Sequence, residues 1–348
     1  LRSKGKAAVM SSNSRMDDAF DNFKPPWGMR SRHTQSLLNS SVLRRRRVMR
    51  SAHDLQNNAE VYTLDGGSGI RLQGLYSKQA SKSRGLAVLL HGWEGSVNSV
   101  YIVANGVRLY KAGFDVFRLN FRDHGDTHHL NQGIFHSCRL AEVIDALRDL
   151  QNRLDAGPWL LAGYSLGGNF SLRVALNAER AGLNLAQVVA VCPVINPANA
   201  MLAMEQGLRF YEWYFERKWS RSLRIKQACF HDLYGDEQWH EIKSVRQRTH
   251  YLAMKHAGFD SADSYFNAYS IAGQRLAALK VPSTLLTSVD DPVVPVGDFE
   301  DLPDNPVLEL IIAPYGGHCG FLKNWKLESL SEDLILQRFL DATRDWSG

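Results

Sequence analysis

The sequence predicts an α/β fold in which helices cover both faces of a mostly parallel sheet and a helical cap is inserted between two strands. From residue 86 onward, short apolar runs of strand length alternate with segments of helical periodicity. A serine flanked by glycine-containing sequence, Ser165, stands directly between one of these runs and a helix. About ninety residues separate the strand that ends near Pro193 from the strand that begins at Ser283, which is too long for a lone helix with its loops.

The individual elements are predicted from periodicity and from helix signals. Residues 100–111 repeat apolar side chains at helical spacing and stop before Gly113, a natural C-terminal cap. The last helix begins near Ser329, which stands three residues before Glu332 at capping-box spacing. Strands are expected at residues 86–90, 116–119, 159–162, 187–192, 283–288 and 307–312. Helices are expected between the earlier strands at residues 100–111, 138–154 and 166–180.

The long connection defines the expected domains. We expect the sheet domain to comprise residues 24–195 and 260–348, and the cap to comprise residues 196–259. Residues 1–23 lack the apolar stretch of a secretory signal and are expected to be a disordered or artificial lead. Within the cap, apolar side chains recur at helical spacing and either pack against the sheet domain, which is the default, or line a substrate pocket. They are Met201, Met204, Leu208, Tyr211 and Phe215, with Phe210, Trp213, Tyr214 and Trp219 beside them.

The composition is that of a globular protein. A chain of 348 residues with 44% hydrophobic and 22% charged content can bury a large core, and no apolar run approaches the roughly 18 residues of a membrane span. The net charge of +5 is a mild excess of 41 basic over 36 acidic residues, and no nucleic-acid motif accompanies it, so no nucleic-acid partner is expected. Cys138, Cys192, Cys229 and Cys319 form no CxxC pair, so we expect reduced thiols, a cytoplasmic location and neither a disulfide nor a zinc framework.

A run of four arginines, residues 44–47, follows two apolar residues near the start of the chain. Two interpretations are open. The run is a solvated charged face or linker, which the lack of interleaved aromatic side chains favours, or it makes peripheral contact with the phosphate headgroups of membrane lipid. The sequence does not indicate an oligomeric state.

Ser165 is the candidate nucleophile. It lies in GYSLG (residues 163–167), a G-x-S-x-G element between the strand at residues 159–162 and the following helix. A serine on such a sharp turn is exposed, the flanking glycines avoid Cβ clashes, and the helix N-terminus stabilises developing negative charge. The bare pattern also occurs by chance, so the prediction depends on the flanking strand and helix.

A serine hydroxyl is a weak nucleophile at neutral pH and needs a base, which a third group orients. His318 is the histidine that follows the last predicted strand, in a glycine-rich loop at residues 314–320. Asp290 and Asp291 both follow the strand at residues 283–288. We favour Asp291 as the acid because it stands four residues before Pro295, as is usual in this loop, and Asp290 remains the alternative acid, with loop capping as its other role.

Two backbone amides are expected to stabilise the oxyanion of a tetrahedral intermediate. One belongs to Leu166, the residue after the nucleophile. The other belongs to Trp93 in HGWEG (residues 91–95), which follows the first buried strand. His91 is expected to brace this turn rather than to titrate.

Side chains that can bind metals stand close together in DHGDTHH (residues 123–129). The spacing is neither H-E-x-x-H nor a Cys/His zinc pattern. The segment follows a predicted strand, where loop side chains that form hydrogen bonds are expected in any case. We therefore expect no metal site, and no cofactor is implied by any other motif.

These segments resemble a known family, the α/β-hydrolase-domain group that contains bacterial hydrolases, phospholipase-like members and medium-chain ethanol acyltransferases. The resemblance is nearly chain-wide and implies an α/β-hydrolase fold and an acyl ester hydrolase or acyltransferase. One departure is RDHG at residues 122–125, where the family often has Arg-Gly-Cys. The similar blocks are RHTQS (32–36), HGWEG (91–95), NFR (120–122), GYSLGGN (163–169), SYF (264–266), DDP (290–292) and GHCGF (317–321).

The sequence thus predicts a carboxylesterase-type serine hydrolase that cleaves a small-molecule acyl ester, short- to medium-chain or lipid-like, through an acyl-Ser165 intermediate. This prediction places the enzyme in lipid metabolism. An acyltransferase or a thioesterase would use the same triad and is the alternative. A non-catalytic binding protein is disfavoured because the candidates for all three triad roles are present.

Overall fold

The computed structural model describes residues 19–154, 157–239 and 241–346. Residues 1–18 of the expected lead lie outside the described residues. The end of that lead is ordered, contrary to the expectation, because Phe20 and Phe23 bury their rings in the core. The ring of Phe20 packs edge-on against Phe321, with 6.4 Å between the ring centroids. Burial of these two aromatic rings ties the segment to the sheet domain.

The described part of the chain forms one eight-stranded sheet. Its strands are β1 (Ala59–Asp65), β2 (Arg71–Ser77), β3 (Leu86–Leu90), β4 (Asp115–Leu119), β5 (Trp159–Tyr164), β6 (Leu185–Val191), β7 (Ser283–Ser288) and β8 (Leu308–Ala313). They lie in the order β1-β2-β4-β3-β5-β6-β7-β8. β3 to β8 pair in parallel, and β1 and β2 add an antiparallel hairpin at the β4 edge. The prediction of a mostly parallel sheet is confirmed.

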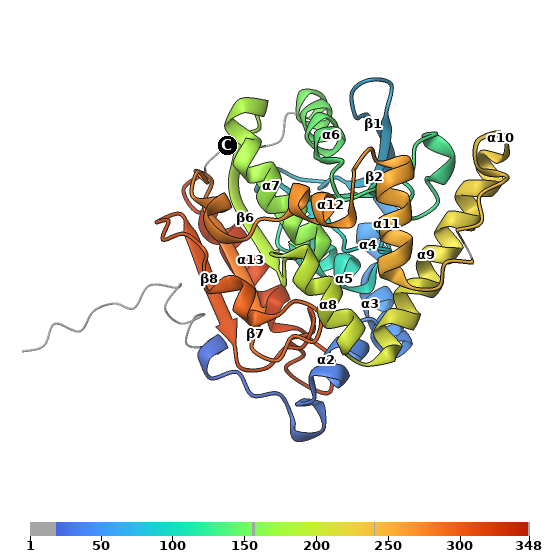
Figure 1. Ribbon diagram of the computed structural model, residues 1–348. Helices are drawn as coiled ribbons and strands as arrows, with labels where there is room; N and C mark the ends of the chain where they lie inside the picture. The colour runs from blue at the N-terminus through green and yellow to red at the C-terminus, as the bar shows by residue number, and fades with distance from the viewer. Residues whose placement is uncertain (1–18, 155–156, 240, 347–348) are drawn as a thin grey trace, which may run out of the picture.

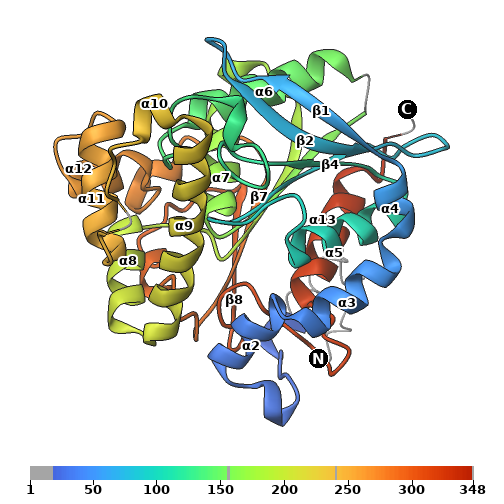
Figure 2. The ribbon, with the colours of Figure 1, turned by 90° about the vertical axis from the view of Figure 1, so that its right-hand side faces the viewer.

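Helices lie on both faces of this sheet (Figures 1 and 2). In chain order the 3-10 and α-helices are η1 (Trp27–Met29), α2 (Arg32–Asn39), α3 (Val42–Ser51), α4 (His53–Asn57), α5 (Val100–Lys111), η2 (His128–Leu130), α6 (Leu140–Arg153), α7 (Leu166–Ala181), α8 (Pro197–Gln206), α9 (Arg209–Cys229), α10 (His231–Tyr234), α11 (Val245–His256), α12 (Ala262–Tyr269), η3 (Gly273–Leu276), η4 (Val296–Phe299) and α13 (Leu330–Ala342). α3, α4, α5 and α13 cover one face, and α6, α7 and the helices that follow α7 cover the other (Figure 2). No helix in the described ranges combines the length and the hydropathy that crossing a membrane needs.

The central strands are buried on both faces, as β3 illustrates. Leu86, Val88 and Leu90 enter the hydrophobic cluster that includes side chains of α6 and α7, whereas Ala87 and Leu89 enter the cluster that includes side chains of α5 and α13. A strand with two buried faces has no polar side to show to water. This is why the central strands read as continuous apolar runs rather than as alternating patterns.

The predicted strands and helices between residues 86 and 313 are all present, and their ends differ from the predicted ones by at most two residues. The hairpin of β1 and β2 was not predicted. Its turn lies in DGGSG (residues 65–69), where Gly67 and Gly69 take positive φ values of 76° and 77°. A glycine-rich turn between two runs of strand length is the signal that identifies it.

The predicted cap segment holds α8, α9, α10 and α11. The apolar stripe expected along one helix is divided between α8 and α9 at Gly207, where a Cβ would lie 2.9 Å from the carbonyl oxygen of Ala203. Leu223, Tyr234 and Trp239 form part of a small separate core under these helices. α12 packs against α8 and α11, so the helical layer over this face continues past residue 259.

The arginine run is part of α3 and is not a linker. Arg44 is buried and forms an ion pair with Glu332 at the start of α13. Its guanidinium also donates to the backbone carbonyl of Leu327 at 2.9 Å and to that of Asn39 at 3.0 Å. Glu332 is therefore engaged by Arg44, and the side chain of Ser329 forms no cap bond, so the expected capping box is wrong.

Candidate active site

Ser165 lies where β5 ends and α7 begins, at the carboxyl edge of the parallel strands. Its backbone φ of 54° is in the left-handed region, as a sharp strand-to-helix turn requires. A Cβ on Gly163 would lie 2.2 Å from the carbonyl oxygen of Gly167, and a Cβ on Gly167 would lie 2.4 Å from the carbonyl oxygen of His91. The turn therefore requires glycine at both positions, and it leaves the Ser165 side chain only half-buried.

Three of the predicted side chains meet at this turn. Nε2 of His318 lies 2.9 Å from Oγ of Ser165, and Nδ1 of His318 lies 2.9 Å from Oδ2 of Asp291. The carboxylate of Asp291 is buried, and its Oδ1 accepts the backbone N–H groups of Val293 at 2.8 Å and Val294 at 3.0 Å. These two amide bonds orient the carboxylate toward the imidazole.

The neighbouring aspartate has a different position. Oδ1 of Asp290 accepts the backbone N–H of Gly317 at 2.9 Å, immediately before His318. Gly317 takes a positive φ of 52°, and a Cβ there would lie 2.2 Å from the carbonyl oxygen of Arg32. Asp290 thus fastens the loop that carries His318, whereas Asp291 reaches the ring itself.

The electrostatics of the pair favour a charged ring. Burial disfavours the imidazolium, but the negative charge of Asp291 and the hydrogen bond to it outweigh burial and raise the pKa of His318 above its ordinary value. The same bond favours a proton on Nδ1, so that the neutral ring presents Nε2 to Ser165 as an acceptor. This arrangement can accept the serine proton and stabilise the cation that results.

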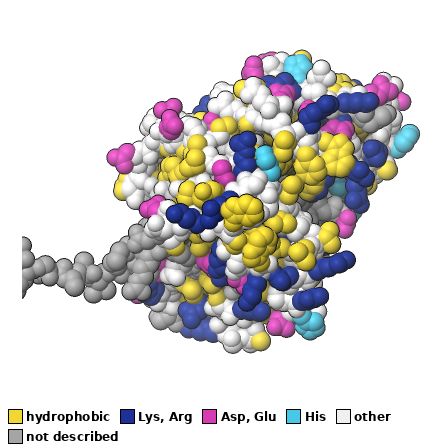
Figure 3. All heavy atoms as spheres, turned by 90° about the horizontal axis from the view of Figure 1, so that it is seen from below, with side chains coloured by type: hydrophobic (Ala, Val, Ile, Leu, Met, Phe, Trp, Pro, Cys, Tyr) yellow, Lys and Arg dark blue, Asp and Glu magenta, His cyan; other side chains and the backbone are white. Residues whose placement is uncertain are grey.

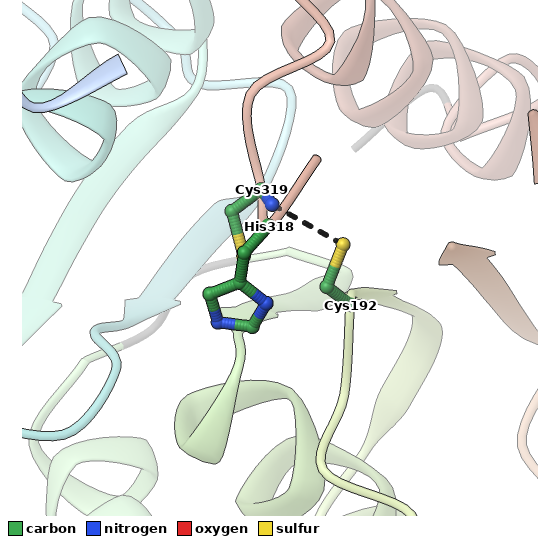
Figure 4. Close-up of side chains that lie close together, drawn as sticks. All are labelled: Cys192, His318 and Cys319. Atoms are coloured by element: carbon green, nitrogen blue, oxygen red, sulfur yellow. Dashed lines mark hydrogen bonds between the residues drawn. The ribbon is translucent and has the colours of Figure 1, made fainter. Parts of the chain in front are cut away.

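Two cysteines lie beside the histidine (Figure 4). The backbone N–H of Cys319 donates to Sγ of Cys192 at 3.3 Å, and Sγ of Cys319 lies 3.7 Å from the carbonyl oxygen of Val191. Both thiols are buried, and burial raises the pKa of Cys192. Donor atoms of Cys192, Cys319 and His318 lie within 4.8 Å of one another. The two ring nitrogens already face Asp291 and Ser165, so a metal ion could use the histidine only by breaking one of those bonds.

The loop after β3 packs directly against the nucleophile. A Cβ on Gly92 would lie 3.3 Å from Cβ of Ser165, so the HGWEG segment lies beside the serine. Among the described residues, the backbone N–H groups of Trp93 and Leu166 meet no acceptor from the protein. Donors that are unpaired at this point are available for a developing oxyanion. Sequence reasoning placed the oxyanion hole at these two amides, and that role belongs to the proposal below.

A pair of buried histidines holds this loop in place. Nδ1 of His91 lies 2.7 Å from the carbonyl oxygen of Gly92, and Nε2 of His91 accepts the backbone N–H of Phe121 at 3.2 Å. Nε2 of His124 accepts the backbone N–H of Glu94 at 3.1 Å. Burial lowers the pKa of His91 to about 4 and that of His124 well below its ordinary value, so both rings stay neutral and can accept these bonds. The expected bracing role of His91 thus has a partner, His124, that sequence reasoning did not identify.

The residues at 123–129 do not converge on a metal site among the described residues. Instead of facing one another, they bind three different parts of the protein. His124 holds the loop after β3, His128 lies 2.8 Å from the hydroxyl of Ser222, and Asp123 accepts from Lys226 at 2.8 Å. The departure from the family pattern in this loop therefore coincides with contacts to α9.

The contact between Asp123 and Lys226 joins the cap to the sheet domain. Both side chains are buried, and the ammonium of Lys226 also donates to the backbone carbonyls of His128 and Asn131. One helical stretch earlier, Lys218 donates to the carbonyl oxygen of Glu94 at 3.0 Å. α9 therefore contacts both loops that surround the serine. Nothing in the local sequence pattern marks either lysine, because each partner lies about a hundred residues away.

A cavity of about 110 Å³ adjoins Ser165 under the helical layer. Met201 and Met204 of α8 and Phe215 and Trp219 of α9 form one side of it. Other lining side chains are Ile134, Leu252, Ala253, Tyr265, Phe266, Tyr269 and Val293. The predicted stripe thus divides: these four side chains line the cavity, whereas Phe210 and Trp213 are 42% and 51% exposed at the surface.

Comparison with known proteins agrees with the resemblance predicted from the sequence. Residues 87–324 match the family described as "alpha/beta hydrolase fold". A protein of Synechocystis sp. named "Putative esterase slr0264" is 24% identical over 355 residues, which cover 94% of this chain and 95% of that protein. The human protein named phospholipase ABHD3 is 22% identical over 266 residues, which cover 75% of this chain and 65% of that protein.

A solved structure shows the same fold. The esterase Pf2001 of Pyrococcus furiosus aligns with a TM-score of 0.55 and 15% sequence identity, over 85% of this chain and 94% of that chain. At this identity the likeness concerns the fold alone. The family match and the names of the relatives support a hydrolase or esterase activity.

The two aspartates give a matched pair of variants. Asp291→Asn should lower kcat for an activated ester by about four orders of magnitude, because the amide no longer holds the imidazole in the required tautomer. Asp290→Asn should lower kcat by less than about tenfold, because it only loosens the loop at Gly317. Equal losses, or the larger loss from Asp290→Asn, would contradict the assignment. Residual activity of Asp291→Asn should titrate at lower pH than wild type, since the pKa of His318 is no longer raised.

Proposed function

The chain belongs to the alpha/beta hydrolase fold family, and on this premise we propose that it hydrolyses carboxylic esters through an acyl-Ser165 intermediate. The observation that carries the proposal is the continuous hydrogen-bonded chain from Ser165 through His318 to Asp291. A buried carboxylate, a histidine and a half-exposed serine in this order are the groups that acyl transfer requires.

In the first half-reaction, Oγ of Ser165 attacks the ester carbonyl carbon while Nε2 of His318 takes the hydroxyl proton. Asp291 keeps its proton acceptor role toward Nδ1 and stabilises the imidazolium. The carbonyl oxygen becomes an oxyanion that accepts from the backbone N–H groups of Trp93 and Leu166. When the tetrahedral intermediate collapses, the bond to the alcohol oxygen breaks and the alcohol leaves with the proton from Nε2.

In the second half-reaction, a water molecule gives a proton to Nε2 of His318 and its oxygen attacks the acyl carbon. The second tetrahedral intermediate returns the proton to Oγ of Ser165 and releases the carboxylic acid. Both half-reactions use side chains and amides of this chain. An alcohol or a thioester in place of water or ester would use the same groups, so the products formed with added ethanol decide between hydrolysis and transfer.

The cavity beside Ser165 supports an ester with an apolar acyl group. Its walls are mostly aliphatic and aromatic side chains, and its volume of about 110 Å³ suits a short acyl chain. Each methylene that enters such a cavity contributes about 0.8 kcal/mol, which is roughly a fourfold gain in binding. The substrate class we propose is therefore short- to medium-chain or lipid-like acyl esters.

Replacement of the nucleophile tests the reaction. Ser165→Ala should lower turnover of a short-chain nitrophenyl ester by at least roughly three orders of magnitude, because the members of a triad act as a unit. A fluorophosphonate probe should label the wild-type protein and leave Ser165→Ala unlabelled. Circular dichroism and thermal melts provide the folding control. A folded variant that retains near-wild-type turnover would exclude Ser165 as the nucleophile.

Two aromatic residues of α9 test the acyl cavity. Phe215 lines the cavity, whereas Trp213 on the same helix is exposed, so the second serves as the matched control. Phe215→Ala should move the optimum of kcat/KM to longer acyl chains by enlarging the cavity, and Trp213→Ala should leave the profile unchanged. The measurement is kcat/KM for a series of water-soluble esters of increasing acyl length. An unchanged profile in Phe215→Ala would show that the acyl group does not occupy this cavity.

A further inference from the structure

One end of the molecule exposes large apolar side chains that the core does not use. Trp27 is 86% exposed, Trp325 is 64% exposed and Trp213 is 51% exposed. We call this surface the docking face. Its apolar members are Trp27, Leu37, Val42, Leu43, Leu208, Phe210, Trp213 and Trp325. Figure 3 shows the end of the molecule that carries α2, where hydrophobic side chains lie among those of lysine and arginine.

These side chains come from segments far apart in the chain that direct contacts join. Nδ1 of His33 in α2 lies 3.0 Å from the hydroxyl of Tyr211 in α9. A Cβ on Gly28 would lie 3.0 Å from the ring of Trp325, so the segment after Trp27 packs against that ring. The backbone carbonyl of Trp325 also accepts from Arg47 in α3 at 3.3 Å. The docking face is therefore one continuous surface.

The charge of the same surface has one sign. Residues 22–53 contain eight basic residues and no acidic residue. Subtracting these eight charges from the net charge of +5 leaves −3 for the rest of the chain, so the basic excess of the protein is located here. Arg44 is paired with Glu332 in the interior. The exposed ones are Lys24, Arg30, Arg32, Arg45, Arg46, Arg47 and Arg50.

The buried sides of these helices anchor them to the active-site loop. Nδ2 of Asn39 donates to the carbonyl oxygen of Cys319 at 2.7 Å, and Oε1 of Gln35 accepts the backbone N–H of Leu322 at 2.6 Å. Oγ of Ser36 accepts the backbone N–H of His318 at 2.8 Å. The docking face is thus rigidly attached and adjoins the histidine of the proposed triad.

We propose that the docking face binds the surface of an anionic lipid bilayer. Tryptophan side chains favour the interface between headgroups and acyl chains, where the ring is apolar and its N–H meets water. Arginines that surround them attract the phosphates of anionic lipids. A large apolar patch without acidic residues and with basic ones throughout fits such a surface better than it fits a second copy, which would bring like charges together.

The same surface supplies a path to the proposed nucleophile, an extension that rests on the proposed function. Phe210 stacks on Tyr214 with 6.2 Å between ring centroids, and Tyr214 meets Phe215 edge-on at 5.5 Å. Phe215 in turn stacks on Trp93 at 5.2 Å, in the loop beside Ser165. Aromatic rings therefore run without a break from the docking face to the cavity. The class of substrate that this path fits is an acyl ester that resides in the bilayer.

Vesicle co-sedimentation tests the docking face without reference to catalysis. The protein should sediment with vesicles of phosphatidylcholine and phosphatidylglycerol in equal parts, should stay in solution with pure phosphatidylcholine, and should dissociate as salt rises. Arg46→Glu with Arg50→Glu should weaken binding at least about tenfold, since each reversal replaces attraction by repulsion. The control is Arg71→Glu with Arg180→Glu, which reverses two exposed charges away from the docking face and should bind like wild type.

The tryptophans require a second pair of variants. Trp27→Ala with Trp325→Ala should lower vesicle binding several-fold, whereas Trp346→Ala should not, because Trp346 packs on Gly157 at the opposite edge of the sheet. Equal binding to neutral and anionic vesicles, or binding unchanged in the docking-face variants, would overturn the proposal. A dimer in light scattering that the tryptophan variants convert to monomer would also overturn it, because a second copy would then cover the face.

Turnover separates this proposal from the proposed function. The docking-face variants should hydrolyse a water-soluble short-chain ester at the wild-type rate and should hydrolyse a fluorogenic acyl ester dissolved in anionic vesicles several-fold more slowly than wild type. If neither ester is hydrolysed by the wild-type protein, the proposed function fails while the sedimentation result still decides the docking face. If both esters are hydrolysed equally well by all variants, the bilayer is not the source of the substrate.

Discussion

Three stretches of backbone meet at Ser165, and their close approach is the constraint on which the site depends. The serine sits on a turn with φ of 54°, and no side chain fits at Gly163 or Gly167 because carbonyl oxygens lie 2.2 Å and 2.4 Å from where a Cβ would be. Gly92 lets the loop after β3 reach the same point. The strain of the turn is held by the packed strands around it, which are buried on both faces. The serine therefore has a fixed position toward which the other loops are arranged.

Segments outside the sheet hold those loops. α2 fastens the histidine loop through Ser36 and Asn39, and α9 reaches the other side of the site through Lys218 and Lys226. Each contact involves a backbone group or a buried ion pair, so its loss would leave an unsatisfied polar group in the interior. The N-terminal helices and the helical layer are thus structural parts of the site, and the same helices carry the surface that we assign to the bilayer.

The sequence predicted what depends on local pattern. Apolar runs identified the buried strands, and the position of Ser165 between a strand and a helix identified the turn, because both signals lie within a few residues. The choice between Asp290 and Asp291 depended on one spacing to Pro295, and the physical difference is tertiary: the amides of residues 293 and 294 orient Asp291 toward His318, whereas Asp290 holds Gly317.

Features formed by distant segments were not predictable in this way. His124 and Lys226 act on partners that no spacing relates to them. The arginine run seemed to lack aromatic neighbours in the sequence, yet folding brings Trp325 to Arg47 and Gly28. The end of the expected lead was wrong for a similar reason, because the partner of Phe20 is Phe321, near the other end of the chain.

The central claim is that ester hydrolysis proceeds through an acyl group on Ser165. Its most direct test is mass spectrometry of protein quenched with acid during turnover of a slowly deacylated ester. The account predicts a mass increase equal to one acyl group, located on the peptide that contains Ser165 and absent before substrate is added. Turnover with no acyl adduct at any time, or with the adduct on another residue, would contradict it.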